Sequence, residues 1–344
     1  MADYPFKGYD NEVLTEQIES TLLTKVDMAR FYTSDFSLTE NPGMKRVIHK
    51  YTGSGEAEDL ARGAKNSNFI DAAYTSEEFT VARTQSQTKW YDDDEMNDPK
   101  LIETKVNTVA ESIANALSTK AIDQFMRSTN GSPAEDWSLG SFADAIAKYA
   151  NVYESQEGLF FLCNVSMVPT LRRMLGDYLQ PTEAYIRTGA IGSILGCGVY
   201  TTKHPGIPNG VVICATRDAV TAFQKKLPFV ERDRDIDSKE NFLVCSYYNI
   251  IALTNEAKCI LMAAPQETPV SITAPAVADT AIAGAGTDGA KVEAFVNGVK
   301  VGEATVASSA YSIACTALKA DDVIKVVARL NGTAPSTALA EVSA

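Results

Sequence analysis

The stretch WYDDDEMNDPKL, residues 90–101, places five acidic residues within nine positions. Such a run is either a metal-binding cluster or the start of a helix. Beyond it, apolar residues recur at spacings of three and four from Ile102 to Phe125, the period of an amphipathic helix. Asp98 is a good N-cap and Pro99 suits the first helical position. A calcium loop needs a glycine turn, which is absent here, so the stretch predicts the start of a helix of about 27 residues.

The segment before this helix is predicted to be a β-strand that is polar on both faces. Residues 78–91, EFTVARTQSQTKWY, are rich in Thr, Val and aromatic residues, which favour strands. From Arg83 to Lys89, however, neither face is apolar. Residues 45–51, KRVIHKY, are a candidate partner across a polar excursion at 53–68. Because an isolated two-stranded ribbon is marginal in water, we expect this ribbon to lie on another subunit.

Residues 140–264 predict a mixed α/β unit, and Ser166 is the expected cap of its second helix. The expected helices are 141–155, 166–179 and 217–226, and the expected strands are 158–165, 195–203, 210–216, 242–254 and 258–264.

The composition changes at Pro265, where a linker rich in Pro and Thr begins. Beyond it, two runs with strand character, 290–296 and 299–306, flank Asn297-Gly298, the strongest short signal for a β-hairpin. Residues 269–344 hold about seven such short runs, which predicts a small β-sandwich of the immunoglobulin type.

Charge and composition exclude several functions. The 344 residues carry a formal net charge of −13, which argues against a protein that neutralises nucleic-acid phosphates. The sequence shows no signal peptide and no membrane span. The six cysteines form no C-x-x-C and the two histidines, His49 and His204, are far apart, so no Cys/His metal site is predicted.

Two motifs imitate binding sites. The G-x-G-x-x-G pattern at 284–289 precedes a strand rather than the helix that a dinucleotide site requires, so it predicts a turn. Asp233, Asp235 and Asp237 imitate an EF-hand loop but lack its glycine and its final glutamate. Residues 231–235 alternate in charge, which favours a salt-bridged loop that sets register between subunits. No G-x-S-x-G, P-loop or H-E-x-x-H is present, so we predict no catalytic, cofactor-binding or metal residues.

In combination, these parts resemble the major capsid proteins of tailed bacteriophages. Residues 76–98 resemble the returning strand of that family's extension loop as it enters the spine helix. Residues 141–174 resemble the helix, strand and helix of its axial domain, and residues 191–226 the strand, loop and strand that follow. Residues 230–263 resemble its final peripheral-domain strands. The resemblance covers about residues 1–265, and residues 269–344 resemble bacterial immunoglobulin-like domains.

The resemblance implies an α+β chain with the tailed-phage major capsid fold, followed by an all-β immunoglobulin-like sandwich. The expected parts are an N-terminal arm (1–43, with one helix at about 12–31), an extension loop (44–97), the spine helix and peripheral domain (98–139), an axial domain (140–228), returning peripheral-domain strands (229–265) and the immunoglobulin-like domain (269–344). The arm begins almost at Met1, which implies a separate scaffolding protein or none.

The implied function is assembly, not catalysis. Copies of the chain are expected to form pentamers and hexamers of an icosahedral head that encloses DNA without sequence-specific binding. The implied partners are scaffolding, portal and decoration proteins, with no membrane and no cofactor. The implied location is the virion capsid, assembled in the host cytoplasm. The residues expected to act in assembly are Arg83, Lys89, Trp90, Asp98, Arg232, Asp233, Arg234 and Asp235.

Two alternatives remain from the sequence. One is the shell of a bacterial nanocompartment with the same fold, which would enclose a cargo enzyme instead of a genome. The other is a secreted hydrolase with an accessory sandwich. The missing signal peptide and catalytic residues count against the hydrolase.

Overall fold

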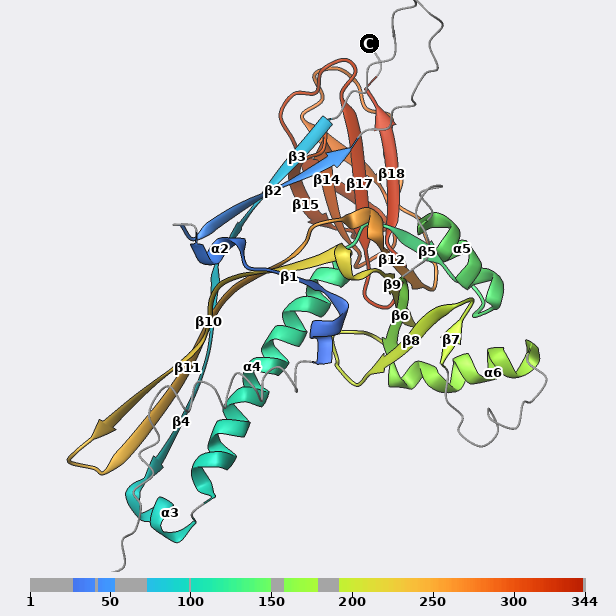
Figure 1. Ribbon diagram of the computed structural model, residues 1–344. Coiled ribbons are helices and arrows are strands. Elements are labelled where there is room, and N and C mark those ends of the chain that lie inside the picture. The colour runs from blue at the N-terminus through green and yellow to red at the C-terminus, as the bar shows by residue number, and fades with distance from the viewer. Residues whose placement is uncertain are drawn as a thin grey trace, which may run out of the picture. The chain divides into compact units, whose positions relative to one another are not determined.

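A computed structural model of the protein describes residues 27–40, 43–52, 73–98, 100–149, 158–178 and 192–342. The expected arm helix, apart from Asp27–Phe31, and the polar excursion lie outside these residues. The chain divides into two compact units (Figure 1). The first comprises the chain up to Arg46 with Phe79–Gln124 and Val220–Leu253, and the second comprises the remainder. Each unit is described by itself.

The first unit is built on a four-stranded sheet in the order β1–β10–β11–β4. Strand β1 is parallel to β10, while β10, β11 and β4 are antiparallel. The strands span Thr33–Asp35 (β1), Val220–Asp235 (β10), Glu240–Leu253 (β11) and Ala82–Tyr91 (β4). Short helices Asp27–Phe31 (η1), Ser37–Glu40 (α2) and Asp92–Asn97 (α3) belong to the same unit.

Helix α4 spans Leu101–Met126, which confirms the predicted helix. Its start also confirms the predicted cap, because Asp98 Oδ1 accepts a hydrogen bond of 2.9 Å from the backbone N–H of Lys100. At about 1.5 Å per residue the helix is roughly 39 Å long. The acids Asp92 to Glu95 are not part of this helix, since they form the separate short helix α3.

Strand β4 explains the polar sequence of residues 83–89. All ten of its residues pair with β11, so the expectation of a ribbon without support in its own subunit is wrong. On one face Thr84, Ser86 and Thr88 are half-buried, whereas the residues between them are exposed. Lys120 of α4 donates a 2.6 Å hydrogen bond to Thr84 Oγ1. The inner face is therefore lined by hydroxyl groups. A search for alternating apolar residues, the usual sign of a half-buried strand, does not detect such a face.

Residues 45–51 pair with a different segment from the one expected. Strand β2 (Lys45–Thr52) pairs with β3 (Ala73–Thr80) in a separate two-stranded sheet. The polar strand β4 follows β3 after one residue, Val81, and joins the other sheet.

Residues 217–226 are not the expected helix. Only Arg217–Ala219 form a helical turn (η3), after which β10 begins at Val220. Thr221 pairs with Thr33 on one side and with Ala252 on the other. Helical spacing was a local signal, and backbone pairing with two neighbouring strands outweighs it.

The second unit contains a six-stranded sheet in the order β5–β12–β9–β6–β8–β7. Apolar side chains from helices α5 and α6 pack with this sheet in one core, where the rings of Phe142 and Phe161 meet edge to face at 4.9 Å. The elements are β5 (Gly131–Pro133), α5 (Leu139–Tyr149), β6 (Phe160–Asn164), η2 (Val165–Met167), α6 (Val168–Tyr178), β7 (Ser193–Ile194), β8 (Cys197–Thr202), β9 (Val211–Ala215), η4 (Glu256–Lys258) and β12 (Cys259–Ala263).

The strands expected at 158–165, 195–203, 210–216, 242–254 and 258–264 are confirmed as β6, β8, β9, β11 and β12. Strand β12 lies beside β9, not beside β11, and the expected boundary at 228/229 falls within β10. The cap of the second helix is Asn164 rather than Ser166, since Asn164 Oδ1 accepts from the backbone N–H of Ser166 at 3.1 Å. The helical turn begins one residue before Ser166, at Val165.

Residues 281–341 of the second unit form a two-stranded sheet, β13–β16, and a four-stranded sheet, β15–β14–β17–β18. The predicted hairpin is confirmed: β14 and β15 flank Asn297 and Gly298, whose φ angles are 50° and 80°, as a type I′ turn requires. Of the turn predicted at 284–289, Gly284 and Ala285 belong to the end of β13, and the chain turns at 288–289 before strand β14 rather than before a helix. The strands are β13 (Ala281–Ala285), β14 (Lys291–Val296), β15 (Val299–Thr305), β16 (Ala310–Ala314), β17 (Val323–Arg329) and β18 (Ser336–Glu341).

The cysteines lie within apolar surroundings. Five of the six are buried, and Cys315 is half-buried. Burial raises the pKa of Cys163 and Cys245 to about 11, so these thiols are protonated near neutral pH. Across the described residues, no helix is long and apolar enough to cross a membrane.

Replacing the cap tests the start of α4. Asp98→Ala removes the acceptor for Lys100 N–H and should lower the free energy of unfolding by about 1 kcal/mol. Chemical denaturation of the two proteins measures this difference. Asp93→Ala, which changes an exposed carboxylate of α3, is the control. Equal losses in the two variants would contradict a specific capping role.

Candidate functional site

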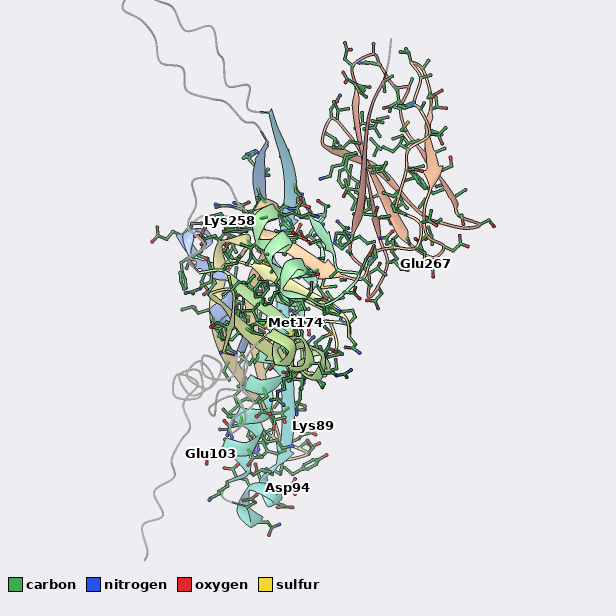
Figure 2. All side chains as sticks on the ribbon, turned by 90° about the vertical axis from the view of Figure 1, so that its right-hand side faces the viewer. Lys89, Asp94, Glu103, Met174, Lys258 and Glu267 are labelled. Carbon is green, nitrogen blue, oxygen red and sulfur yellow. The ribbon has the colours of Figure 1, made fainter. Side chains whose placement is uncertain are left out.

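The residues expected to act in assembly gather mainly at one end of the first unit. There the β10–β11 hairpin turns and β4 leads into α3, a region marked in Figure 2 by Lys89 and Asp94. Arg234, Asn241 and Trp90 are direct neighbours across the three strands. We call Trp90, Asp92, Arg232, Arg234 and Asn241 the hairpin cluster.

Asn241 is the centre of the hairpin cluster. Its side chain is 1% exposed, so its amide must find partners within the protein. It donates a 2.6 Å hydrogen bond to Asp92 Oδ1 and accepts one of 3.2 Å from Arg232 Nη2. One buried amide therefore links β11 to α3 on one side and to β10 on the other. This role could not be predicted from the sequence, because an Asn in a strand is not distinctive.

Asp92 joins the same cluster through both carboxylate oxygens. Oδ1 accepts from Asn241, and Oδ2 forms an ion pair and hydrogen bond with Arg234. The hydrogen bond from Asn241 is the main cause that lowers the pKa of Asp92; burial opposes it, and the hydrogen bond and positive charge of Arg234 lower the pKa further. The carboxylate is thus held in its charged form by neighbours on two other strands.

Trp90 closes the cluster from β4. It is 3% exposed, and its indole Nε1 donates a 3.1 Å hydrogen bond to Glu95 Oε2. The Arg232 guanidinium carbon lies 5.5 Å from the centre of the Trp90 ring, within the range of a cation–π contact.

These contacts answer the question of the acidic run. Asp92 bonds to Asn241 and Arg234, Glu95 to Trp90, and Asp98 to Lys100. Asp94 Oδ2 accepts from the backbone N–H of Tyr91 at 3.4 Å. The carboxylates are used to fix the turn from β4 into the helices. Within the described ranges, no group of three or more His, Cys, Asp or Glu residues is placed to hold a metal ion.

The turn of the β10–β11 hairpin is ordered by its own aspartates. Asp235 accepts from the backbone N–H of Asp237 at 3.0 Å and from Ser238 Oγ at 2.9 Å, and these bonds lower its pKa. Asp233 Oδ1 accepts from the backbone N–H of Arg234 at 2.8 Å. The expected salt bridging along residues 231–235 therefore takes another form, in which Arg234 pairs with Asp92 of α3.

The remaining predicted residues lie around this cluster or away from it. Lys89 pairs with Glu240 at 2.7 Å, which raises the pKa of the lysine. Arg83 stands opposite Tyr248, far along β4 from Trp90. The same end of the unit also carries exposed apolar side chains, Ile236 in the hairpin turn and Met96 on α3, which are 75% and 82% exposed. Neither residue is distinctive in the sequence, because single apolar residues within polar runs are common on protein surfaces.

Comparison with known proteins shows which solved structures share this fold. No protein-family model matches the sequence, and no curated protein sequence matches it. Solved structures do match. The capsid of an empty GTA particle shares 12% identity and a TM-score of 0.56 over 70% of this chain and 90% of the other. The mature capsid of bacteriophage PhiM1 shares 8% sequence identity with a TM-score of 0.54, over 69% of this chain and 86% of the other. A structure from Mycobacterium phage Che8 shares 13% sequence identity with a TM-score of 0.51, over 64% of this chain and 85% of the other. Over 64–70% of its length, the chain therefore has the fold of these structures, two of which are capsids.

Trp90 is expected to be a major support of the cluster. Trp90→Ala removes a buried ring and the donor to Glu95, so it should lower the free energy of unfolding by about 3–5 kcal/mol. Trp90→Phe keeps an aromatic ring and should lose less. Denaturant unfolding of both variants gives the comparison. A loss below about 1 kcal/mol for Trp90→Ala would show that the ring is not needed there.

The lowered pKa of Asp92 predicts a dependence on pH. A group whose pKa is lower in the folded than in the unfolded protein contributes stability above about pH 4, and this contribution is lost as the pH falls through the folded-state pKa. Asp92→Asn should therefore lower the melting temperature near pH 7, and its difference from the wild type should shrink near pH 3. Asp93→Asn is the control for a general effect of charge. A difference that stays constant across this range would rule out the charged pair as the cause.

Proposed function

We propose that this chain is a major capsid protein, many copies of which form the pentamers and hexamers of an icosahedral phage head around a DNA genome. The observation that carries the proposal is the extent of the fold match: 70% of this chain aligns with 90% of a GTA capsid chain. The alignment leaves little of that capsid subunit unmatched. The role is structural, and no catalytic step is assigned to any residue.

The charge of the chain fits an enclosing shell. A formal charge of −13 per subunit makes the shell repel phosphates on average. Such a shell holds packaged DNA without binding it tightly or reading its sequence. Scaffolding, portal and decoration proteins are the partners that such a head would need, and the virion assembled in the host cytoplasm is the corresponding location.

The hairpin cluster and its surroundings are the proposed assembly surface. The cluster itself is satisfied internally, so its part is to hold the end of the sheet rigid. Exposed groups around it, such as Lys89 and Asp233, are then presented in a fixed arrangement to a neighbouring copy. The exposed side chains of Ile236 and Met96 supply apolar surface that burial in such a contact would favour.

Residues 269–344 are proposed to be an appended immunoglobulin-like domain. The two sheets of this region share one apolar core, formed by residues such as Ile282, Val292, Tyr311 and Val326. Two sheets that bury their inner faces against each other are the plan of a β-sandwich. The arm, extension loop, spine, peripheral and axial parts keep the proposed ranges 1–43, 44–97, 98–139, 140–228 and 229–265.

A nanocompartment shell remains the alternative function, because it would use the same fold and the same closed assembly. The two functions differ in what the shell encloses. Particles purified from the native source would contain packaged double-stranded DNA in the first case and a cargo enzyme in the second.

Electron microscopy of the purified or coexpressed protein tests the proposal. We expect closed shells or capsomers of five and six copies, because the fold matches chains from assembled capsids. Size-exclusion chromatography with light scattering gives the mass of the assembly. A protein that remains a monomer across salt and pH conditions, with a scaffolding protein supplied, would contradict the proposal.

The immunoglobulin-like domain is expected on the outer surface of the shell. Residues 269–344 contain seven acidic and five basic residues, a net charge of −2, so an inner position would place acidic surface against packed phosphates. An outer position avoids this repulsion. A reconstruction of closed shells locates the domain directly, and density for it on the inner face would overturn the prediction.

A further inference from the structure

The four-stranded sheet β15–β14–β17–β18 buries side chains on both of its faces. On β17, Ile324 and Val326 point into the core that the two sheets share. Val327 alternates with them and therefore lies on the opposite face, yet it is fully buried, with 0% exposure. The face that an isolated sandwich would turn to water is therefore covered around Val327, whereas Leu339 and Val323 on the same face are 69% and 47% exposed.

The cover is the segment that follows helix α4, in the same compact unit. Three side chains on this outer face reach it. Arg329 Nη2 donates to the carbonyl of Arg127 at 2.7 Å, and Thr337 Oγ1 donates to the carbonyl of Thr129 at 3.4 Å. Lys325 Nζ donates to Thr129 Oγ1 at 3.2 Å.

The residues of this segment bond to two partners, and Thr129 bonds to both, because its backbone N–H and its Oγ1 also donate to Glu256 Oε1. Arg127 and Thr129 offer carbonyls to the β17 and β18 side chains, as described. Ser128 and Asn130 lie between them and bond the other way, toward strand β12 and its preceding turn. Ser128 Oγ donates to the carbonyl of Cys259 at 2.7 Å, and Asn130 Nδ2 donates to that of Glu256 at 2.7 Å. The segment is thus bonded between the six-stranded sheet and residues 269–342, which we call the β-domain.

The linker is also tied down by backbone bonds. The amide of Ala334 donates to the carbonyl of Ala264 at 2.8 Å, beside a β-bridge between Ala264 and Thr333. Gln266 is 6% exposed, and its Nε2 donates to the carbonyls of Ala328 at 3.0 Å and Ala334 at 3.1 Å. A residue of the linker is therefore buried within the domain that the linker introduces, which a free hinge would not require.

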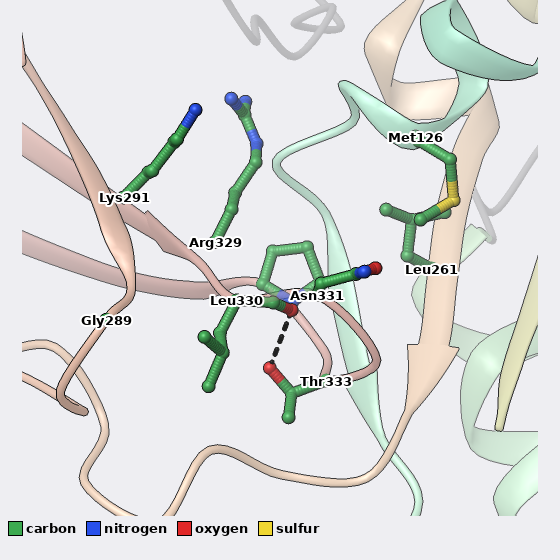
Figure 3. Close-up of a pocket in the computed structure, with 9 residues that line it drawn as sticks. Met126, Leu261, Gly289, Lys291, Arg329, Leu330, Asn331 and Thr333 are labelled. Carbon is green, nitrogen blue, oxygen red and sulfur yellow. Dashed lines mark hydrogen bonds between the residues drawn. The ribbon is translucent and has the colours of Figure 1, made fainter. Parts of the chain in front are cut away.

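Gly131 lies very close to Pro335 in this contact. A Cβ atom placed on Gly131 would lie 2.3 Å from the carbonyl oxygen of Pro335, a distance that no side chain tolerates. Beside it is a cavity of about 330 Å³, which lies between Met126 and Leu261 on one side and Leu330 and Thr333 on the other (Figure 3). The two segments are thus closely packed at Gly131 and Pro335, and a cavity separates them at the edge of the contact.

We infer that the β-domain, residues 269–342, is fixed rigidly on its own subunit through the outer face of its four-stranded sheet, with the segment 127–131 as its seat. It is not a module on a flexible tether. If the proposed function holds, a shell of these subunits presents its β-domains in one repeated orientation, so a ligand with several binding sites would meet a regular array.

Hydrogen exchange on the full chain tests the fixed seat without requiring assembly. The amide of Ala334 bonds across the contact, whereas the amide of Val327 pairs within its own sheet. We expect Ala334 to exchange at least about a hundredfold more slowly than an unprotected amide. Exchange of Ala334 at the unprotected rate, with Val327 still protected, would overturn the inference.

A matched pair of variants tests the cause. Gly131→Ala should push Pro335 away and speed the exchange of Ala334 by at least about tenfold, while amides within β14 and β17 keep their protection. Gly192→Ala is the control, because a Cβ there would meet nothing within 4 Å. If Gly131→Ala fails to fold, Lys325→Met and Thr337→Val remove two bonds of the seat without adding bulk and should give the same selective change. Variants that leave Ala334 as protected as the wild type would contradict the role assigned to this contact.

Reconstructed shells separate this inference from the proposed function. Rigid seating predicts β-domain density as strong as that of the body in the wild type, and weaker density in Gly131→Ala than in Gly192→Ala. Shells with smeared β-domains in the wild type would refute the seat and leave the capsid function standing. The absence of any shell would refute the function, and the exchange data would still decide the inference.

Discussion

The buried amide of Asn241 fixes the register on which the first unit depends. Strand β11 lies between β10, its hairpin partner, and β4, which is distant from both in the sequence. The amide bonds to Arg232 of β10 and to Asp92 at the start of α3. A slip of one residue would turn Asn241 to the opposite face and leave these partners without it. An unsatisfied buried amide or charge costs about 1–3 kcal/mol or more, so the polar cluster excludes alternative registers that apolar packing alone would tolerate.

The polar edge strand β4 follows from the same constraint. It pairs with β11 along one edge, and its inner side chains are small hydroxyls, with Lys120 bonded to Thr84. Its outer residues, among them Gln85 and Lys89, are charged or amide-bearing and exposed. Such a strand does not invite non-specific strand pairing, because charged and polar edges discourage it. In a chain proposed to assemble through defined surfaces, an edge that resists pairing elsewhere helps to keep the assembly specific.

Polar hydrogen bonds also fix the β-domain to the rest of its compact unit. Its inner core is apolar and complete in itself, but its outer sheet face is bonded to the 127–131 segment by Lys325, Arg329 and Thr337. The same segment supports strand β12 on its other side. The junction after α4 thus joins the six-stranded sheet to the β-domain, which explains why a region that looks like an appendage in sequence belongs to the same compact unit as that sheet.

The sequence by itself determined the features that depend on local bonds and local periodicity. Helix α4 and its Asp98 cap, the Asn297-Gly298 hairpin and the apolar strands β6, β9 and β12 needed only neighbouring residues to be recognised. The order of these parts along the chain also indicated the fold. Comparison of sequences alone does not detect this fold, because the matching structures share only 8–13% identity with the chain. Only the tertiary structure decided that residues 220–226 are a strand, that β4 pairs with β11, that Asn241 organises the hairpin cluster and that Gly131 seats the β-domain. Each of these depends on a partner far away in the chain, and the free energy of such a pairing is not encoded in the period or propensity of either segment alone.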